Sequence, residues 1–135
     1  MIDRKKLGKV VFSDEKALRD LNAITHNAVK EDVLRMLPNQ PSLVAIDAIG
    51  LFEGDLAPLC HTTVAVTAPE EMRVRRLMER DGISEEYALS RIRAQRADEE
   101  FAHLCNFTLQ NSETEEAFRK KCLAFLWGLD IIEAE

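Results

Sequence analysis

The hydrophobic pattern changes along the chain, from helical spacing to short continuous runs. Apolar residues three or four positions apart predict a helix over 14–24 and a separate helix over 26–37. The first would begin at Ser13 or Asp14, whose side-chain oxygens both offer an N-cap, and the second would end before Pro38. The segment 5–12 fits either a short helix or a strand. We therefore expect a helical beginning of the chain.

Two short runs of small and β-branched residues follow, at 43–46 and 62–66. Each lies between turn residues and has no polar alternation, which is typical of a strand buried on both faces in a parallel sheet. A third, weaker strand is expected at 107–109. Because these runs alternate with helical segments, we predict an α/β fold with about three strands, which is a thin and incomplete sheet for that class.

Helices are expected between and after the last two strands. Pro69 opens one helix, and Ser84 caps the next. The Asp81-Gly82 turn joins these two helices into a hairpin. An S-x-x-E capping box at 112–115 predicts the start of a last helix.

The composition fits one ordinary soluble domain. The 135 residues are 46% hydrophobic and carry a net charge of -6, which argues against nonspecific nucleic-acid binding because such binding needs a basic surface. No apolar run is long enough for a signal peptide or a membrane span. The three cysteines are widely spaced and indicate neither a disulfide framework nor a zinc site. We therefore expect a cytoplasmic protein without nucleic-acid, membrane or metal-binding residues.

The arginines are concentrated in the expected hairpin. Seven of the eleven lie between Arg73 and Arg96, an interval without lysine. Arg76 and Arg80 are one helical turn apart, and Arg91 lies across the turn on the partner helix. A guanidinium group can donate two parallel hydrogen bonds to the oxygens of one phosphate. The arginines on this face therefore predict a helical hairpin that closes over phosphates. The alternative is a solvated helix face balanced by nearby acids: Glu70, Glu71, Glu79, Glu85 and Glu86.

Other candidate residues are isolated. Asp47 directly follows the first expected strand, where a parallel sheet binds ligands, but a role as the N-cap of the next turn stays open. A lone histidine such as His26 is more often structural than catalytic. No G-x-x-x-x-G-K-[ST] loop occurs, and the five glycines are not clustered. The sequence therefore lacks a backbone cradle for a triphosphate.

Five segments, in order, resemble blocks of the dephospho-coenzyme A kinases. The family blocks are "(L/I)DR..L...VF.D...L..LN.I.HP", "D-V-P-L-L-F-E", a Pro-Glu helix start followed by "R-x-x-x-R-D", "R-I-x-x-Q" and "A-D-x-V-I-x-N". The matching segments are Ile2 to His26, Asp47 to Glu53, Pro69-Glu70 with Arg76 to Asp81, Arg91 to Gln95, and, more loosely, Cys105 to Asn111. Together they cover nearly the whole chain.

The resemblance implies an incomplete P-loop kinase-like domain over 1–135, with a helical acceptor-site portion at 1–40 and a helical lid at 70–103. It implies the last step of coenzyme A biosynthesis, the ATP-dependent 3′-phosphorylation of dephospho-coenzyme A, with ATP and Mg²⁺. Carried over by position, Arg80 and Arg91 would be catalytic contacts to ATP phosphates. Arg76 would bind ATP or anchor the lid, and Asn111 would lie near the adenine. The acceptor site would be formed by Asp3, Arg4, His26 and Asp47.

The sequence also departs from the family. In the family, the first strand, the P-loop and the proposed general base all precede the position that matches Ile2, so they are absent from this sequence. In addition, Asn27, Ile49 and Asp98 replace typical family residues. We therefore expect the C-terminal two-thirds of such a kinase, truncated and inactive by itself. The alternative is a non-catalytic interaction module that associates with itself through an exposed sheet edge. A fragment of another nucleoside-phosphate kinase fits less well because of the 47–53 block.

Overall fold

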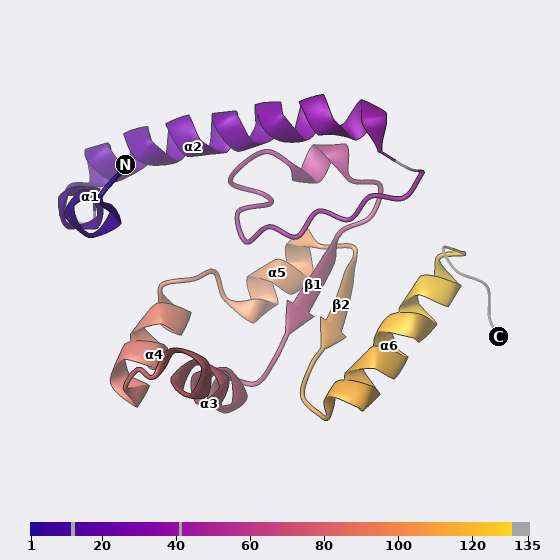
Figure 1. The fold of residues 1–135 in the computed structure, drawn as a ribbon. Coiled ribbons are helices and arrows are strands. Elements are labelled where there is room, and N and C mark those ends of the chain that lie inside the picture. Colours follow the sequence, from indigo (N-terminus) through magenta and orange to yellow (C-terminus); the bar gives the residue numbers. More distant parts are fainter. Residues whose placement is uncertain (12, 41, 131–135) are drawn as a thin grey trace. The chain divides into compact units, whose positions relative to one another are not determined.

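The computed structural model describes residues 1–11, 13–40 and 42–130. They form two units, Met1–His61 and Thr62–Glu135, each with its own internal contacts. The first unit consists of helices and loops, and the second contains the sheet (Figure 1).

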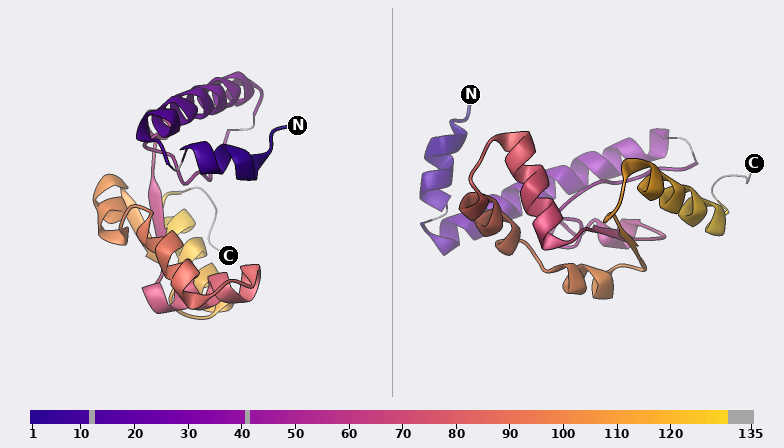
Figure 2. Two further views of the ribbon diagram at one scale, coloured as in Figure 1. Left: turned by 90° about the vertical axis from the view of Figure 1, so that its left-hand side faces the viewer. Right: turned by 90° about the horizontal axis from the view of Figure 1, so that it is seen from below.

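The first unit is built on two helices, α1 (Arg4–Val11) and α2 (Glu15–Met36), which contact each other (Figure 2). Of the two predicted caps, Asp14 is the one that forms: its carboxylate accepts hydrogen bonds from the backbone N–H groups of Lys16 and Ala17 at 2.8 and 3.1 Å. The Ser13 hydroxyl instead donates to carbonyls at the end of α1. The predicted break between 24 and 26 is wrong. No glycine or proline interrupts the chain there, and the Thr25 hydroxyl bonds back to the carbonyl of the preceding turn.

The expected strand at 43–46 is also wrong. After the short 3₁₀ helix η1 (Leu37–Asn39), residues 42–48 have no regular secondary structure, and Leu43 and Val44 are exposed. A strand needs a hydrogen-bonded neighbour, and no segment within the described ranges pairs with this one. A turn at 50–55 and a second 3₁₀ helix, η2 (Ala57–Leu59), complete the unit.

The second unit contains two parallel strands, β1 (Val64–Thr67) and β2 (Phe107–Gln110), in the register Val64 opposite Phe107. The α/β class, the two strands and their parallel direction are therefore confirmed, with two strands in the described residues in place of about three. The chain between them forms α3 (Glu70–Asp81), α4 (Glu85–Arg93) and α5 (Asp98–Leu104).

Helices cover both sides of this small sheet. α5 contacts β1, and α6 (Glu115–Gly128) contacts β2 (Figure 1). The rings of Phe107 and Phe125 meet edge to face, with centroids 5.2 Å apart. The capping prediction at Ser112 is wrong by two residues: the hydroxyl of Thr114 accepts the hydrogen bond from the Ala117 N–H at 3.2 Å. Two glutamates directly follow Thr114, which favours a helix start at that position.

An apolar seam joins α3 and α4. Val74, Ala88 and Ile92 are buried there, and Leu77, Ile83 and Leu89 pack around them. Gly82 adopts a left-handed conformation, with φ 63°, and ends α3 as glycine commonly does. The predicted cap of α4 is confirmed, since the Ser84 hydroxyl accepts a hydrogen bond from the Tyr87 N–H. The seam and these two caps fix the hairpin that carries the arginines.

The start of the sheet is closed by a side-chain contact. The Asn106 side-chain oxygen accepts hydrogen bonds from the N–H and the hydroxyl of Thr63, at 2.9 and 3.0 Å. The Thr63 hydroxyl in turn accepts one from the Asn106 N–H at 3.0 Å. Because Thr63 is buried, these reciprocal bonds satisfy polar groups that water would reach poorly.

Candidate functional site

Four arginines line one pocket on the α3–α4 hairpin. Arg73, Arg76 and Arg80 lie on α3 at spacings of three and four residues, so they share one helix face, and Arg91 faces them from α4. The pocket has a volume of about 720 Å³. Its remaining lining residues are Leu77, Glu79, Ile92 and Gln95. The two predicted catalytic arginines and Arg76 are therefore brought together.

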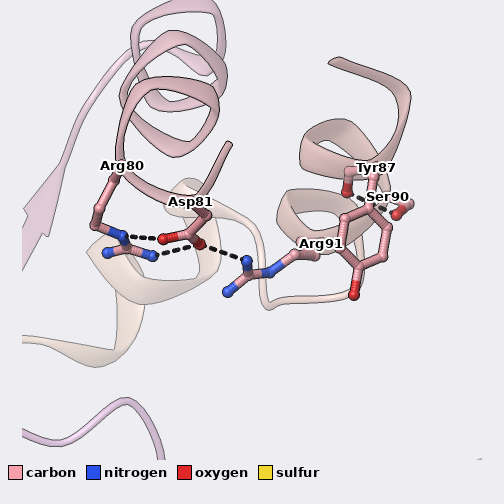
Figure 3. Close-up of polar contacts among 5 residues, drawn as sticks. All are labelled: Arg80, Asp81, Tyr87, Ser90 and Arg91. Atoms are coloured by element: carbon pink, nitrogen blue, oxygen red, sulfur yellow. Dashed lines mark hydrogen bonds and ion pairs between the residues drawn. The ribbon is translucent and has the colours of Figure 1, made fainter. Parts of the chain in front are cut away.

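Asp81 lies between two of these arginines (Figure 3). Arg80 donates to it from Nε at 2.7 Å and from Nη2 at 3.1 Å, and Arg91 donates from Nη1 at 2.7 Å. Arg80 and Asp81 end α3, whereas Arg91 belongs to α4, so the carboxylate connects the two helices. This bridge orients both guanidinium groups at one side of the pocket.

The electrostatic consequence is a strongly stabilised carboxylate. Hydrogen bonds from Arg80, then from Arg91, lower the pKa of Asp81 from 3.8 to about 2. The same contact raises the pKa of Arg80 above its ordinary value. Asp81 therefore stays ionised throughout the physiological pH range.

The other two arginines have different partners. Arg73 forms an ion pair with Asp98 at 3.1 Å and donates to the Gln95 side chain at 3.1 Å. Arg76 lies at the long end of hydrogen-bonding distance from Asn111, 3.4 Å from its carbonyl and 3.5 Å from its side-chain oxygen. Within the described part of the chain Arg76 forms no ion pair, so no carboxylate offsets its charge.

The pocket is basic although the protein is acidic. Four guanidinium groups face three carboxylates, those of Glu79, Asp81 and Asp98, which leaves one positive charge in excess. Arginine forks match the geometry of phosphate oxygens, and local charge governs the binding of a small anion more than net charge does. The arrangement is suited to binding a phosphate or polyphosphate.

A second pocket, of about 630 Å³, lies at the carboxyl ends of both strands. Thr67 and Gln110, the last residues of β1 and β2, line it together with Arg73. Parallel sheets bind their ligands at this edge. Because Arg73 lines both pockets, the arginine pocket adjoins the edge where a ligand of the sheet would be expected.

The remaining predicted residues belong to the first unit. The Asp3 carboxylate accepts a hydrogen bond from the Lys6 N–H at 3.1 Å and so caps α1, which begins at the exposed Arg4. Asp47 is exposed in the segment before the 50–55 turn. His26 is half-buried on α2.

His26 lies against the 50–55 turn. An added Cβ at Gly50 would be 3.8 Å from His26 Nε2, and one at Gly54 would be 3.9 Å from the ring and only 2.9 Å from the Gly50 carbonyl. One helical turn further along α2, Lys30 forms an ion pair with Asp55, a residue with a positive φ of 54°. The structure thus brings His26 close to the 47–53 block that the sequence singled out.

Sequence reasoning missed several of these contacts. Asp81 and Gln95 were noted only as a turn residue and as members of the family blocks, and Arg73 and Lys30 were given no individual role. The adjacency of Arg80 and Asp81 was visible, but the second partner, Arg91, is ten residues away and depends on how the hairpin packs. Asp98, a departure from the family pattern, is the ion-pair partner of Arg73.

Over residues 1–11, 13–40 and 42–130, no group of three or more histidine, cysteine or acidic side chains has the arrangement of a metal site. Among the helices described here, none is both long enough and apolar enough to cross a membrane.

Comparisons with known proteins agree with the predicted resemblance. A family model described as dephospho-CoA kinase matches residues 1–116. Dephospho-CoA kinases of Carboxydothermus hydrogenoformans and Geobacillus kaustophilus are 37% and 35% identical, covering 93% and 98% of this chain and 63% and 68% of their own. The chain thus spans about two thirds of the length of these curated relatives.

Solved structures give the same result. A crystal structure from Thermus thermophilus superposes with a TM-score of 0.79 at 36% identity, covering 94% of this chain and 67% of its own. A dephospho-CoA kinase from Campylobacter jejuni has a TM-score of 0.60 at 27% identity, over 95% of this chain and 65% of its own.

The Asp81 carboxylate is expected to titrate with a midpoint near pH 2, measured by the pH dependence of its side-chain ¹³C signal. Because its pKa is lowered in the folded state, its contacts stabilise the fold above about pH 4, and this contribution is lost as the pH falls towards 2. Arg91→Ala should raise the midpoint by removing one donor. A midpoint near 3.8 in the unaltered protein would contradict the bridge.

Proposed function

Because the chain belongs to the dephospho-CoA kinase family, we propose that its residues serve the transfer of the ATP γ-phosphoryl group to the ribose 3′-hydroxyl of dephospho-coenzyme A. The observation that carries this proposal is the basic pocket on the hairpin. Although the protein has a net negative charge, four arginines line this one pocket. Their positive charge would attract the negatively charged triphosphate of ATP. The proposed ligands are ATP and dephospho-coenzyme A.

The roles within the pocket follow from what each arginine contacts. Arg80 and Arg91 would donate to the phosphate oxygens as charge develops on them, which is the usual protein contribution to phosphoryl transfer. Arg76 would bind a further phosphate oxygen, exchanging its long contacts with Asn111 for shorter ones. Asn111 would lie near the adenine. The hairpin would act as a lid over the nucleotide.

The first unit would supply the acceptor site. His26, held against the 50–55 turn, and Asp47, just before that turn, would contact or orient dephospho-coenzyme A. Asp3 and Arg4 would shape the same site from the start of α1, in addition to the helix cap that Asp3 provides. The family's Mg²⁺ would accompany the nucleotide, and no residue of this chain is assigned to it.

A cytoplasmic location accords with this function. Cys60, Cys105 and Cys122 are all free thiols, the state that a reducing compartment maintains.

The 135-residue chain by itself is expected to form no coenzyme A from dephospho-coenzyme A, ATP and Mg²⁺, assayed by chromatography of the product. Its sequence has no phosphate-binding loop with the lysine and hydroxyl that hold the β- and γ-phosphates. A full-length dephospho-CoA kinase serves as the positive control. Any ATP-dependent formation of coenzyme A above background would refute the expected inactivity of the isolated chain. It would leave the proposed kinase function intact.

The arginine pocket is expected to bind inorganic tripolyphosphate weakly, with a dissociation constant measured by isothermal titration calorimetry. Arg76→Ala should weaken binding by about ten- to a hundredfold, because a charge-assisted hydrogen bond contributes about 1.5 to 3 kcal/mol. Arg75→Ala is the matched control, since Arg75 precedes Arg76 on α3 but lines a different pocket. Equal losses in both variants would indicate a nonspecific charge effect and count against the pocket.

A second candidate function, self-association, has one observation in its favour. In the described residues each strand of the β1–β2 sheet has an edge without a partner strand, and Val66 and Phe107 are exposed. Such edges pair readily with another copy of the same chain.

If self-association occurs, sedimentation should show a dimer that Val66→Lys converts to a monomer. A charged side chain on the strand would disfavour pairing at its edge. Ile24→Lys is the control, because Ile24 is equally apolar and exposed but lies on α2. A wild-type protein that stays monomeric at all concentrations tested would eliminate this candidate.

A further inference from the structure

Asp81 occupies an unfavourable position for an acid. It is the last residue of α3, where the backbone carbonyls of the helix end carry partial negative charge. Gly82 then turns the chain towards α4, and the Asp81 side chain lies between the two helices (Figure 3). Hydrogen bonds from Arg80 and Arg91 offset the repulsion between the carboxylate and the helix end. The position of the carboxylate therefore depends on the two arginines, and the positions of the arginines depend on the carboxylate.

The contacts leave most of the arginine donors unused. A guanidinium group has five N–H donors. Arg80 uses Nε and Nη2 for Asp81, and Arg91 uses only Nη1. In the described part of the chain, Nη1 of Arg80 forms no hydrogen bond, and neither does Nε or Nη2 of Arg91. Asp81 therefore holds the two groups without occupying them.

Asp81 has two opposite effects on an incoming anion. Its negative charge repels the anion, which would weaken binding. Its contacts also restrict two long side chains that otherwise lose rotamer freedom when a ligand immobilises them, which would strengthen binding. The structure favours the second effect, because Asp81 with Arg80 and Arg91 keeps one positive charge in excess and several donors free.

We propose that Asp81 is a positioning residue of the arginine pocket, which orients the guanidinium groups of Arg80 and Arg91 for phosphate oxygens. This inference rests on the proposed function of the pocket in binding phosphate. It has an unusual consequence: removing the negative charge of Asp81 should weaken the binding of an anion. A plain charge effect would have the opposite sign.

Glu79 provides a matched control within the same pocket. It lies two residues before Asp81 on α3 and lines the pocket, yet among the residues described it forms no ion pair. Asp81→Asn and Glu79→Gln each remove one negative charge and preserve the size of the side chain. Only the first substitution releases two arginines.

The test measures tripolyphosphate affinity by calorimetry for the wild type and both variants at one ionic strength. Glu79→Gln should bind more tightly than the wild type, and Asp81→Asn more weakly, by about threefold, within the range that an exposed ion pair contributes. If Asp81→Asn binds more tightly, as Glu79→Gln does, Asp81 is only a competing charge and the inference is overturned. If the wild type does not bind tripolyphosphate at all, the proposed phosphate site itself fails.

A second measurement does not depend on the variant folding. In the wild type, the Arg80 Nε–H donates to Asp81 and should exchange with solvent more slowly than that of Arg75, an exposed side chain that forms no hydrogen bond or ion pair among the described residues. Equal exchange rates for the two arginines in ¹⁵N spectra would overturn the positioning role whatever the stability of Asp81→Asn. Slow exchange at Arg80 that is lost in Asp81→Asn would support it.

Discussion

The candidate site depends on the apolar contact between α3 and α4. Val74, Ala88 and Ile92 are buried in this seam, and burial of such side chains is the main favourable contribution to packing two helices together. Once the seam is formed, the helix period determines which residues lie beside it, and the seam residues Leu77 and Ile92 line the same pocket as the arginines. Arg73, Arg76 and Arg80 then converge with Arg91 on one pocket. The apolar residues thus place the charged ones, although they bind nothing themselves.

Charge repulsion limits how closely four arginine side chains can approach one another. Carboxylates that form ion pairs with three of them reduce this repulsion. Asp81 bridges Arg80 and Arg91, and Asp98 pairs with Arg73. The Arg80–Asp81 pair is largely exposed, and such pairs contribute little to stability, so this contact is more important for orientation than for holding the hairpin together. Arg76 is left with neutral partners. The pocket therefore contains three arginines oriented by carboxylates and one arginine, Arg76, whose charge no carboxylate offsets.

The sequence predicted the features that depend on local pattern. The caps at Asp14 and Ser84, the hairpin turn and the positions of the two strands follow from residues close together in the chain. The features that failed depend on distant partners. The 43–46 run has the composition of a strand, but without a paired neighbour composition does not produce one. The Asp81–Arg91 and Lys30–Asp55 ion pairs were missed for the same reason, because their partners are ten and 25 residues apart.

The α3–α4 hairpin is held together by buried apolar side chains, whereas Asn111 connects it to the sheet through hydrogen bonds. The Asn111 N–H donates to the Thr67 carbonyl at 2.7 Å and so extends the parallel ladder, while the Asn111 side chain and carbonyl lie 3.4 to 3.5 Å from Arg76. A short bond therefore anchors Asn111 to the strands, and only long, exposed ones connect it to α3. Long hydrogen bonds to an exposed arginine are readily exchanged for water or a ligand anion. An anion that bound Arg76 would replace this connection, so ligand binding and the position of the hairpin over the carboxyl ends of β1 and β2 would be coupled through one side chain.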